Sequence, residues 1–212
     1  MDSEFIAIIA APPCSTYSIS RFIGDPRAAD GGAPVVRTRR EPSGLLSPSK
    51  GHRRELDAAN ALTKRTVMLL AAAQQVGTQW VLENPADRGD PNDAKLFINA
   101  DHAPLWITPE ILALRKACNA GFATFPMCAF GAPWQKYTSL MFSAGFDTFL
   151  APLSQLMCDH DRHELPAGGK HDKGAWRSPA AAAYPPNFNY FLARAVLSLR
   201  VLEYPLMSGY VH

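Results

Sequence analysis

The thiol of Cys14, in the segment APPCSTYS, is the first side chain in this sequence with clear chemical potential. It follows an apolar run at residues 5–10, whose length and Ile content predict a β-strand buried on both faces. Pro12 and Pro13 restrict the backbone after this strand, so they would present the thiol from a rigid base. Such a base suits a nucleophile that must meet a ring carbon at a fixed distance. The alternative is a small apolar cysteine packed behind a buried strand.

A carboxylate, Glu83, follows a second apolar segment at residues 78–82, in the motif WVLENP. In open α/β sheets, ligands bind outside the carboxyl ends of the parallel strands. If the two segments are neighbouring parallel strands, Cys14 and Glu83 lie side by side and face one ligand. The alternative is a carboxylate that caps a helix or forms a salt bridge.

The elements that would position these side chains alternate between strand and helix. Apolar residues at helical spacing predict a helix over residues 56–76 that stops at Gly77. Thr108 and Pro109 are typical of a helix start, and they predict a helix over 109–120. The remaining expectations are strands at 122–130 and 139–142, an irregular stretch at 146–176 and a last helix at 190–202. This order is typical of the second half of a doubly wound α/β sheet.

The segment from Pro12 to Ser18 matches the PPC-x-x-x-Ser loop of the cytosine-5 DNA methyltransferases. Three more blocks follow in that family's order: ENP at 83–85, FGAPWQKYTSLMF at 130–142 and AAYPPNF at 182–188. The chain therefore resembles this family from about residue 5 to residue 199. The resemblance implies a Rossmann-like class I methyltransferase sheet, incomplete and limited to its carboxyl-terminal half. Residues 1–145 would form the catalytic half-domain, 146–176 a short irregular recognition insert, and 177–212 a late motif and final helix that return to the same domain.

The reaction of this family implies a role for each matching residue. Cys14 would add to carbon 6 of a cytosine flipped out of the duplex, and carbon 5 would then take a methyl group from S-adenosylmethionine. Glu83 would hold the base through ring nitrogen 3 and the exocyclic amine. The remaining substrate-side positions implied by the match are Pro12, Pro13, Ser15, Ser18, Asn84, Pro85, Lys136 and Thr138.

Several positions depart from the family pattern. Trp134 replaces a Gln, Lys136 and Thr138 replace two arginines, and Ser15 stands where a Gln is usual. Thr138 cannot supply the planar fork of an arginine, so contacts to bases or phosphates there would be weaker. The insert at 146–176 is also too short for an extensive base-reading module, so we expect little sequence specificity.

The largest departure concerns the methyl donor. No strand, glycine-rich turn and helix precede residue 5, although such a unit binds S-adenosylmethionine in the family. The chain is therefore expected to be a truncated product, one half of an enzyme completed by a second polypeptide, or a non-catalytic nucleic-acid-binding relative. In each case the strand at 5–10 would leave an apolar edge open to pairing.

Basic residues concentrate in residues 24–54, which are rich in Gly, Pro and Ser and predict a long mobile loop. The formal net charge of +2 is too small to identify a DNA-binding protein, so DNA contact would depend on this cluster. Its members either contact phosphate beside the catalytic loop or are merely solvated: Arg37, Arg39, Arg40, Arg53 and Arg54.

Four scattered cysteines and the absence of a long apolar run favour an intracellular protein, cytoplasmic or nuclear, without a membrane partner. Cys158, His160 and His163, with His171 nearby, could bind zinc or could simply belong to a polar loop. Trp106, Trp134 and Trp176 could stack on a base, although core packing is the simpler interpretation.

Overall fold

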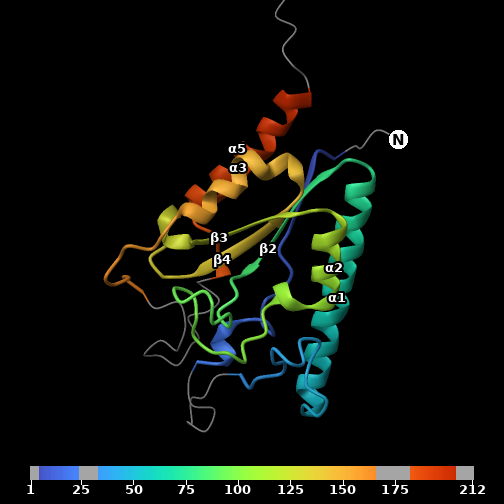
Figure 1. The fold of residues 1–212 in the computed structure, drawn as a ribbon, viewed down its shortest axis with the longest axis vertical. Coiled ribbons are helices and arrows are strands. Elements are labelled where there is room, and N and C mark those ends of the chain that lie inside the picture. The colour runs from blue at the N-terminus through green and yellow to red at the C-terminus, as the bar shows by residue number, and fades with distance from the viewer. Residues whose placement is uncertain (1–4, 24–32, 166–181, 204–212) are drawn as a thin grey trace, which may run out of the picture.

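A computed structural model describes residues 5–23, 33–165 and 182–203 and gives a mixed four-stranded sheet (Figure 1). The strands are β1 (Ala7–Ala10), β2 (Gln79–Pro85), β3 (Gly121–Pro126) and β4 (Tyr137–Phe142), in the spatial order β1-β2-β4-β3. β1 and β2 are parallel, with Ala10 opposite Leu82. β4 runs antiparallel to both β2 and β3. The α/β class predicted from the alternation of strands and helices is confirmed.

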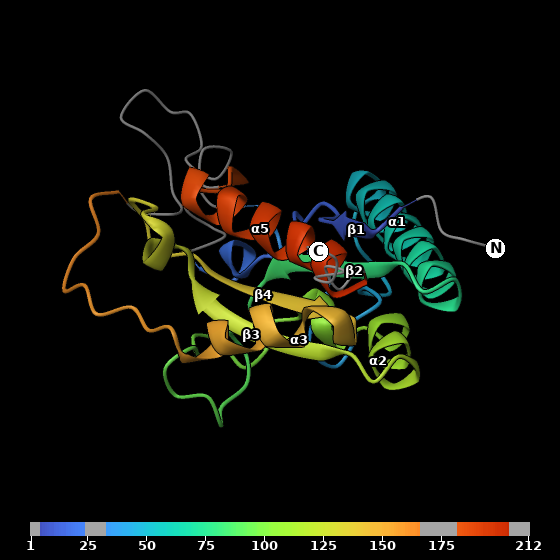
Figure 2. The ribbon, with the colours of Figure 1, turned by 90° about the horizontal axis from the view of Figure 1, so that it is seen from above.

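Helices cover both faces of this sheet, as the two views in Figures 1 and 2 show. α1 (Lys50–Gln75) and α2 (Pro109–Ala117) lie on one face. α3 (Asp147–Leu150) and α5 (Pro186–Glu203) lie on the other. The layers are therefore helix, sheet and helix.

The side chains of the strands alternate between two hydrophobic cores, because successive residues of a strand point to opposite faces. Trp80, Leu82 and Met141 belong to the core under α1 and α2. Val81 and Leu140 belong to the core under α3 and α5. Glu83 has the same parity as Val81, so it points to the α5 side of the sheet.

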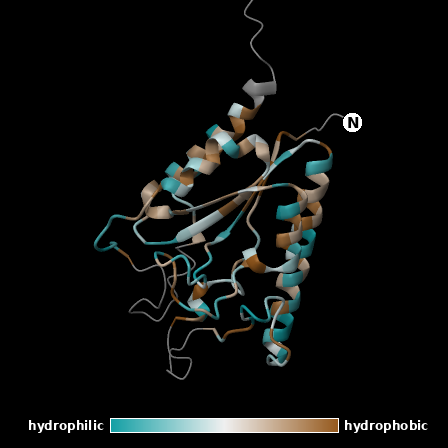
Figure 3. Ribbon diagram, in the orientation of Figure 1, coloured by the Kyte–Doolittle hydropathy of each residue, from teal (hydrophilic) through white to brown (hydrophobic). Residues whose placement is uncertain are grey.

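α1 begins at Lys50, six residues before the predicted start at residue 56. Ser49 caps this helix and accepts a hydrogen bond from the His52 N–H. The first turn of α1 is basic and polar. Apolar periodicity therefore predicted only the rest of the helix, where hydrophobic and hydrophilic residues are interspersed (Figure 3). Arg53 and Arg54 consequently lie on a helix, whereas the sequence placed them in a loop. Gly77 follows the helix with φ of +76°, as predicted for its stop.

Other boundaries also differ from the sequence predictions, including the start of α5 at Pro186 instead of residue 190 and the end of α2 at Ala117 instead of residue 120. β2 continues through Pro85, so Glu83 and Asn84 lie within the strand and not after it. β3 ends at Pro126, and a 3₁₀ turn follows at Met127–Phe130. Residues 147–155, predicted to be irregular, form α3 and a 3₁₀ helix that bury Leu150 and Leu153 in the core on the α5 side of the sheet. The prediction for 166–176 falls outside the described residues.

β1 pairs only with β2 among the described residues, so it forms an edge of the sheet. Its residues are half-buried or exposed, and Ile9 keeps 47% of its surface accessible. The prediction that this strand is buried on both faces is therefore wrong for the part of the chain that the structure describes. None of the described helices combines the length and apolar character that crossing a bilayer demands.

Candidate active site

Three segments that are distant in the sequence meet at Glu83: β2, β4 and the residues just before α5. On the paired strands β2 and β4, Glu83 is opposite Leu140 and Pro85 is opposite Thr138, so Glu83 and Thr138 share the α5 face. Tyr184, just before α5, donates a hydrogen bond of 2.7 Å from its hydroxyl to Oε2 of Glu83. Residues separated by about a hundred positions therefore converge on one carboxyl group.

The carboxyl group of Glu83 is almost completely buried, with 6% of the residue exposed. Burial raises its pKa, although Lys136 and the hydroxyls of Tyr184 and Thr138 partly counteract this effect. Its Oε1 atom has no hydrogen bond of good geometry, and although the Thr138 hydroxyl is close enough to lower the pKa of the carboxyl, its Oγ1 atom has none either. Unsatisfied buried polar atoms are rare in folded proteins, so their presence together marks a place where a polar ligand could complete the hydrogen bonds.

Cys14 belongs to the same electrostatic neighbourhood as this carboxyl group. Burial raises the pKa of the Cys14 thiol, Lys136 lowers it and Glu83 raises it further. Burial and the adjacent Glu83 also raise the pKa of Tyr184, and Cys14 contributes to that shift. The thiol, the carboxyl, the ammonium and the phenol are thus close enough to influence one another, as expected when β1 and β2 end at the same edge of the sheet.

The loop that carries Cys14 is fixed from three sides. Asn84 donates from Nδ2 to the Pro12 carbonyl over 3.1 Å, which ties the loop directly to β2. The Tyr17 N–H donates to the Cys14 carbonyl over 2.9 Å and closes a turn around the cysteine. The Tyr17 hydroxyl lies 2.8 Å from Oγ1 of Thr63 on α1. These contacts position the thiol and give Asn84 a clear structural role.

Of the predicted phosphate-binding residues, Arg37 is completely buried. Its guanidinium lies 4.0 Å from the centre of the Tyr17 ring and donates to the Thr16 hydroxyl over 2.9 Å. It also donates to the Pro42 carbonyl over 2.6 Å. The structure therefore uses Arg37 to support the Cys14 loop from behind.

The other four basic residues divide into two pairs. Arg39 forms an ion pair with Asp87, and Arg53 donates to the carbonyls of residues 45 and 46. Arg40 and Arg54 are exposed to solvent. The surface available for phosphate contact is thus smaller than the five-residue cluster in the sequence suggested.

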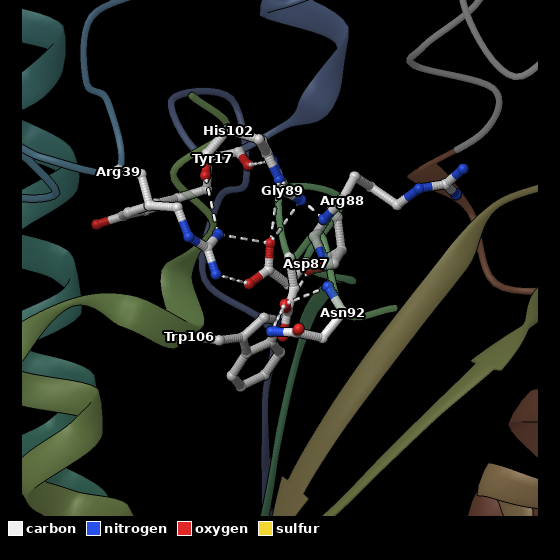
Figure 4. A network of polar contacts seen from close by, with 10 residues as sticks. Tyr17, Arg39, Asp87, Arg88, Gly89, Asn92, His102 and Trp106 are labelled. Atoms are coloured by element: carbon white, nitrogen blue, oxygen red, sulfur yellow. Dashed lines mark hydrogen bonds and ion pairs between the residues drawn. The ribbon is translucent and has the colours of Figure 1, made fainter. Parts of the chain in front are cut away.

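A polar network behind the site ties together the Arg39 loop, the Cys14 loop and the segment after β2 (Figure 4). Arg39 donates two hydrogen bonds, of 2.9 and 2.8 Å, to the two oxygens of Asp87, and the Gly89 N–H donates a third over 2.8 Å. His102 is fully buried and donates from Nε2 to the Tyr17 carbonyl over 2.9 Å. A Cβ atom at position 89 would lie 2.9 Å from the His102 carbonyl, so glycine is required for this packing.

Sequence analysis missed Tyr184, Asp87 and His102 as members of the site. Tyr184 lies within the AAYPPNF block, but its hydroxyl contacts a residue 101 positions away, and nothing in the local pattern indicates this contact. Asp87 and His102 lie in an irregular segment, for which periodicity gives no information. The sequence indicates them only as polar residues in the segment that follows a strand with a candidate catalytic residue.

Several remaining predicted residues take structural positions. Ser18 caps a 3₁₀ turn and accepts from the Ser20 N–H, whereas Pro13 and Ser15 are exposed beside Cys14. Trp106 is buried in the core, where its Nε1 donates to the Pro85 carbonyl over 2.8 Å. Trp134 packs against the other core, and Trp176 lies outside the described residues.

Two shallow surface pockets among the described residues lie away from Cys14 and Glu83. One, of about 460 Å³, is lined by Asp90, Asn92, Asp93, Ala94 and Lys95, and the other, of about 320 Å³, lies between Phe122 and Met157. Because only 6% of Glu83 is exposed, a base would reach its carboxyl only after side chains around it, such as Tyr184, had moved.

The described residues do not by themselves fit S-adenosylmethionine. A donor cradle needs a glycine in the turn between a parallel strand and the next helix, where backbone can approach the cofactor. Of the described glycines, Gly44 and Gly89 lie between a parallel strand and the following helix. Gly44 packs against Leu56 and Gly89 packs against His102, so neither faces open space.

Cys158, His160 and His163, for which zinc binding and a polar loop were the alternatives, lie together, and Cys128 joins them. No protein-family model, curated protein or solved structure matches this chain.

Proposed function

We propose that this chain is the catalytic half of a cytosine-5 DNA methyltransferase-like protein, in which Cys14 attacks a cytosine held by Glu83. The observation that carries the proposal is that the Cys14 thiol, which follows β1, and the buried Glu83 carboxyl, near the end of the adjacent parallel strand β2, lie close enough for Glu83 to raise the pKa of the thiol. The position of β4, antiparallel between β2 and β3, is compatible with the carboxyl-terminal half of a Rossmann-like class I methyltransferase sheet.

The chemistry requires a thiolate at Cys14 and a proton on Glu83. Burial raises the pKa of both groups, so it favours the proton on Glu83 and opposes the thiolate, which Lys136 partly stabilises. Cys14 loses its proton to water, and its sulfur forms a bond to carbon 6 of the ring. The electron pair of the bond between carbons 5 and 6 moves toward carbon 5 and into the ring. Glu83 keeps its proton more readily than an ordinary carboxyl, so it can donate that proton to ring nitrogen 3 and neutralise the developing charge.

The neighbours of Glu83 suit this role. Lys136 lowers the pKa of both Cys14 and Glu83, so it favours the thiolate and partly offsets the effect of burial on the carboxyl. The unpaired Oε1 of Glu83 and the unpaired hydroxyl oxygen of Thr138 offer acceptors for the exocyclic amine of the base.

Methyl transfer itself would need S-adenosylmethionine bound by another segment or by a second polypeptide. The edge of β1 that has no strand partner among residues 5–23, 33–165 and 182–203 is where further strands of such a donor-binding half would pair. The part of the reaction that belongs to the described residues is therefore base capture and addition to carbon 6.

This step can be tested without the methyl donor, because addition makes carbon 5 basic. Carbon 5 takes a deuteron from D₂O, loses its original proton, and expulsion of the thiolate returns a cytosine labelled at carbon 5. We expect the wild-type chain to catalyse this exchange in duplex DNA, Cys14→Ala to abolish it, and Cys118→Ser to retain it. Trapping on 5-fluorocytosine DNA with added S-adenosylmethionine would extend the test to methyl transfer.

Two results would contradict the proposal. Exchange that persists in Cys14→Ala would show that another group attacks the base. Salt-dependent DNA binding by the folded wild-type chain without any exchange would instead favour a non-catalytic nucleic-acid-binding relative.

A further inference from the structure

A second cluster of reactive side chains lies at the connection between β3 and β4, at the same edge of the sheet as Glu83 and Thr138. One ligand atom from each of Cys128, Cys158, His160 and His163 lies within 4.8 Å of the others. Cys128 belongs to the 3₁₀ turn after β3, and the other three come from a segment thirty residues later. The sequence pattern Cys-x-His-x-x-His therefore gains its fourth member only through the fold.

The distances in this cluster match those that a tetrahedral ion imposes. Zinc bonds to sulfur at about 2.3 Å and to imidazole nitrogen at about 2.0–2.1 Å, which places a sulfur and a nitrogen on the same ion roughly 3.6 Å apart. The sulfur of Cys158 lies 3.3 Å from Nε2 of His163 and 3.9 Å from Nδ1 of His160. These two separations bracket the expected value.

We propose that Cys128, Cys158, His160 and His163 bind one zinc ion. Two thiolates and two imidazoles form one of the ligand sets that zinc adopts in structural sites, and they leave no coordination position for water or substrate. The site would therefore stabilise the fold and take no direct part in catalysis. This inference does not depend on the proposed methyltransferase chemistry.

The location explains what such an ion would do. Residues 156–165 form neither a helix nor a strand, and in Figure 2 this segment, drawn in orange, leaves the sheet and returns toward the connection between β3 and β4. Two hydrogen bonds link it to that connection: the Leu165 N–H donates to the Pro133 carbonyl over 2.9 Å, and Gln135 Nε2 donates to the sulfur of Cys158 over 3.4 Å. An ion bound to Cys128 would fasten the segment to the turn that leads into β4.

Two other interpretations of the same cluster make different predictions. The sulfurs of Cys128 and Cys158 are near enough for a disulfide to be considered, which would consume two thiols and lower the mass by two hydrogens. Asp159 lies 3.6 Å from Nδ1 of His160, but its side chain is 92% exposed, so an ion pair there would be weak.

The test is metal analysis of the full chain purified under reducing conditions, without chelator, after expression with added zinc. We expect about one zinc ion per chain in the wild type, as four protein ligands require. Cys158→Ser and His163→Ala should each reduce the zinc content at least fivefold. Cys118→Ser is the matched control, because it removes a cysteine outside the cluster, and it should retain the full zinc content.

A spectroscopic measurement on the wild type covers the case in which the variants fail to fold. Replacement of zinc by Co²⁺ should give the intense visible bands of a tetrahedral ion and the ultraviolet absorption of two cobalt–thiolate bonds. Chelation should lower the melting temperature of the wild type and of Cys118→Ser by roughly 5 °C or more. A wild-type chain without stoichiometric zinc, a chain with a Cys128–Cys158 disulfide, or an octahedral cobalt spectrum would each overturn the proposal.

Discussion

Asp87→Asn is the sharpest test of how the Cys14 loop is supported, because it removes one charge and preserves the shape of the side chain. Asp87 is central to the network in Figure 4, where it accepts from Arg39 and from the Gly89 N–H. His102 Nδ1 lies 3.7 Å from Oδ1 of Asp87 and accepts from the Arg88 N–H over 3.0 Å, while its Nε2 donates to the Tyr17 carbonyl.

The expected loss of unfolding free energy in Asp87→Asn follows from the pKa of Asp87. Burial alone would raise this pKa, but contacts with His102, with Arg39 and with the Gly89 N–H lower it from 3.8 to about 2. One pKa unit corresponds to about 1.4 kcal/mol, so the full shift would equal about 2.5 kcal/mol. Because the Arg39 and Asp87 side chains are 30% and 23% exposed, solvent screens part of this interaction, and we expect Asp87→Asn to cost about 1–2 kcal/mol at pH 7.

The stabilisation by ionised Asp87 should decrease as the pH falls. A lowered carboxyl pKa stabilises the fold above the unfolded pKa, near 3.8, and that stabilisation disappears as the pH falls toward 2. Urea unfolding of the wild type and Asp87→Asn should therefore show a constant difference between pH 5 and 8 and a smaller one at pH 3. Asp57→Asn, at an exposed position on α1, is the control. A difference that grows as the pH falls, or one no larger than in the control, would refute this account.

Three further changes test the fold and the DNA surface. Phe188→Ala empties a fully buried site between α5 and the sheet and should cost about 3–5 kcal/mol in urea unfolding. Ser143→Ala removes the buried hydroxyl that accepts from the Trp80 N–H over 2.9 Å and should cost about 1–2 kcal/mol in the same assay. If Arg40 and Arg54 contact phosphate, changing both to Ala should flatten the dependence of log affinity on log salt by about 2, as measured by fluorescence anisotropy.

The side-by-side placement of the two strand ends was predictable because it depends on rules that act locally. Two short apolar runs separated by a long helical segment form a parallel pair, and parallel strands place their carboxyl ends at one edge. That reasoning located the Cys14 loop beside β2. It did not establish that Glu83 lies within β2, because ladder pairing with β4 extends the strand through Pro85.

What could not be predicted depends on contacts between segments far apart in the sequence. Tyr184 reaches Glu83 only because α5 returns across the sheet, and Cys128 joins the histidine cluster only because a 3₁₀ turn follows β3. Arg37 looked like a solvated cation among glycines and prolines, yet it is buried against Tyr17. A basic, polar composition describes the average exposure of a segment and not the position of each of its side chains.

Glu83→Gln separates a functional carboxyl from a structural one. Burial raises the pKa of Glu83, so the folded chain holds this proton more tightly than the unfolded chain does. The stability that this proton contributes is complete below the unfolded pKa, near 4.5, and is lost as the pH rises toward the folded pKa. Gln is neutral at every pH and still accepts from the Tyr184 hydroxyl, so the variant should be more stable than the wild type at pH 8.

The same variant should lose hydrogen exchange at carbon 5 of cytosine, because the Gln amide has no carboxyl proton to give to ring nitrogen 3. Gain of stability combined with loss of exchange is the expected signature of a group that serves chemistry at the expense of the fold. A structural carboxyl would behave differently, since its replacement would destabilise the chain at pH 8. Chemical unfolding at pH 5 and pH 8, paired with the exchange assay, decides between these outcomes, and a Glu83→Gln chain less stable than the wild type at pH 8 would refute the argument.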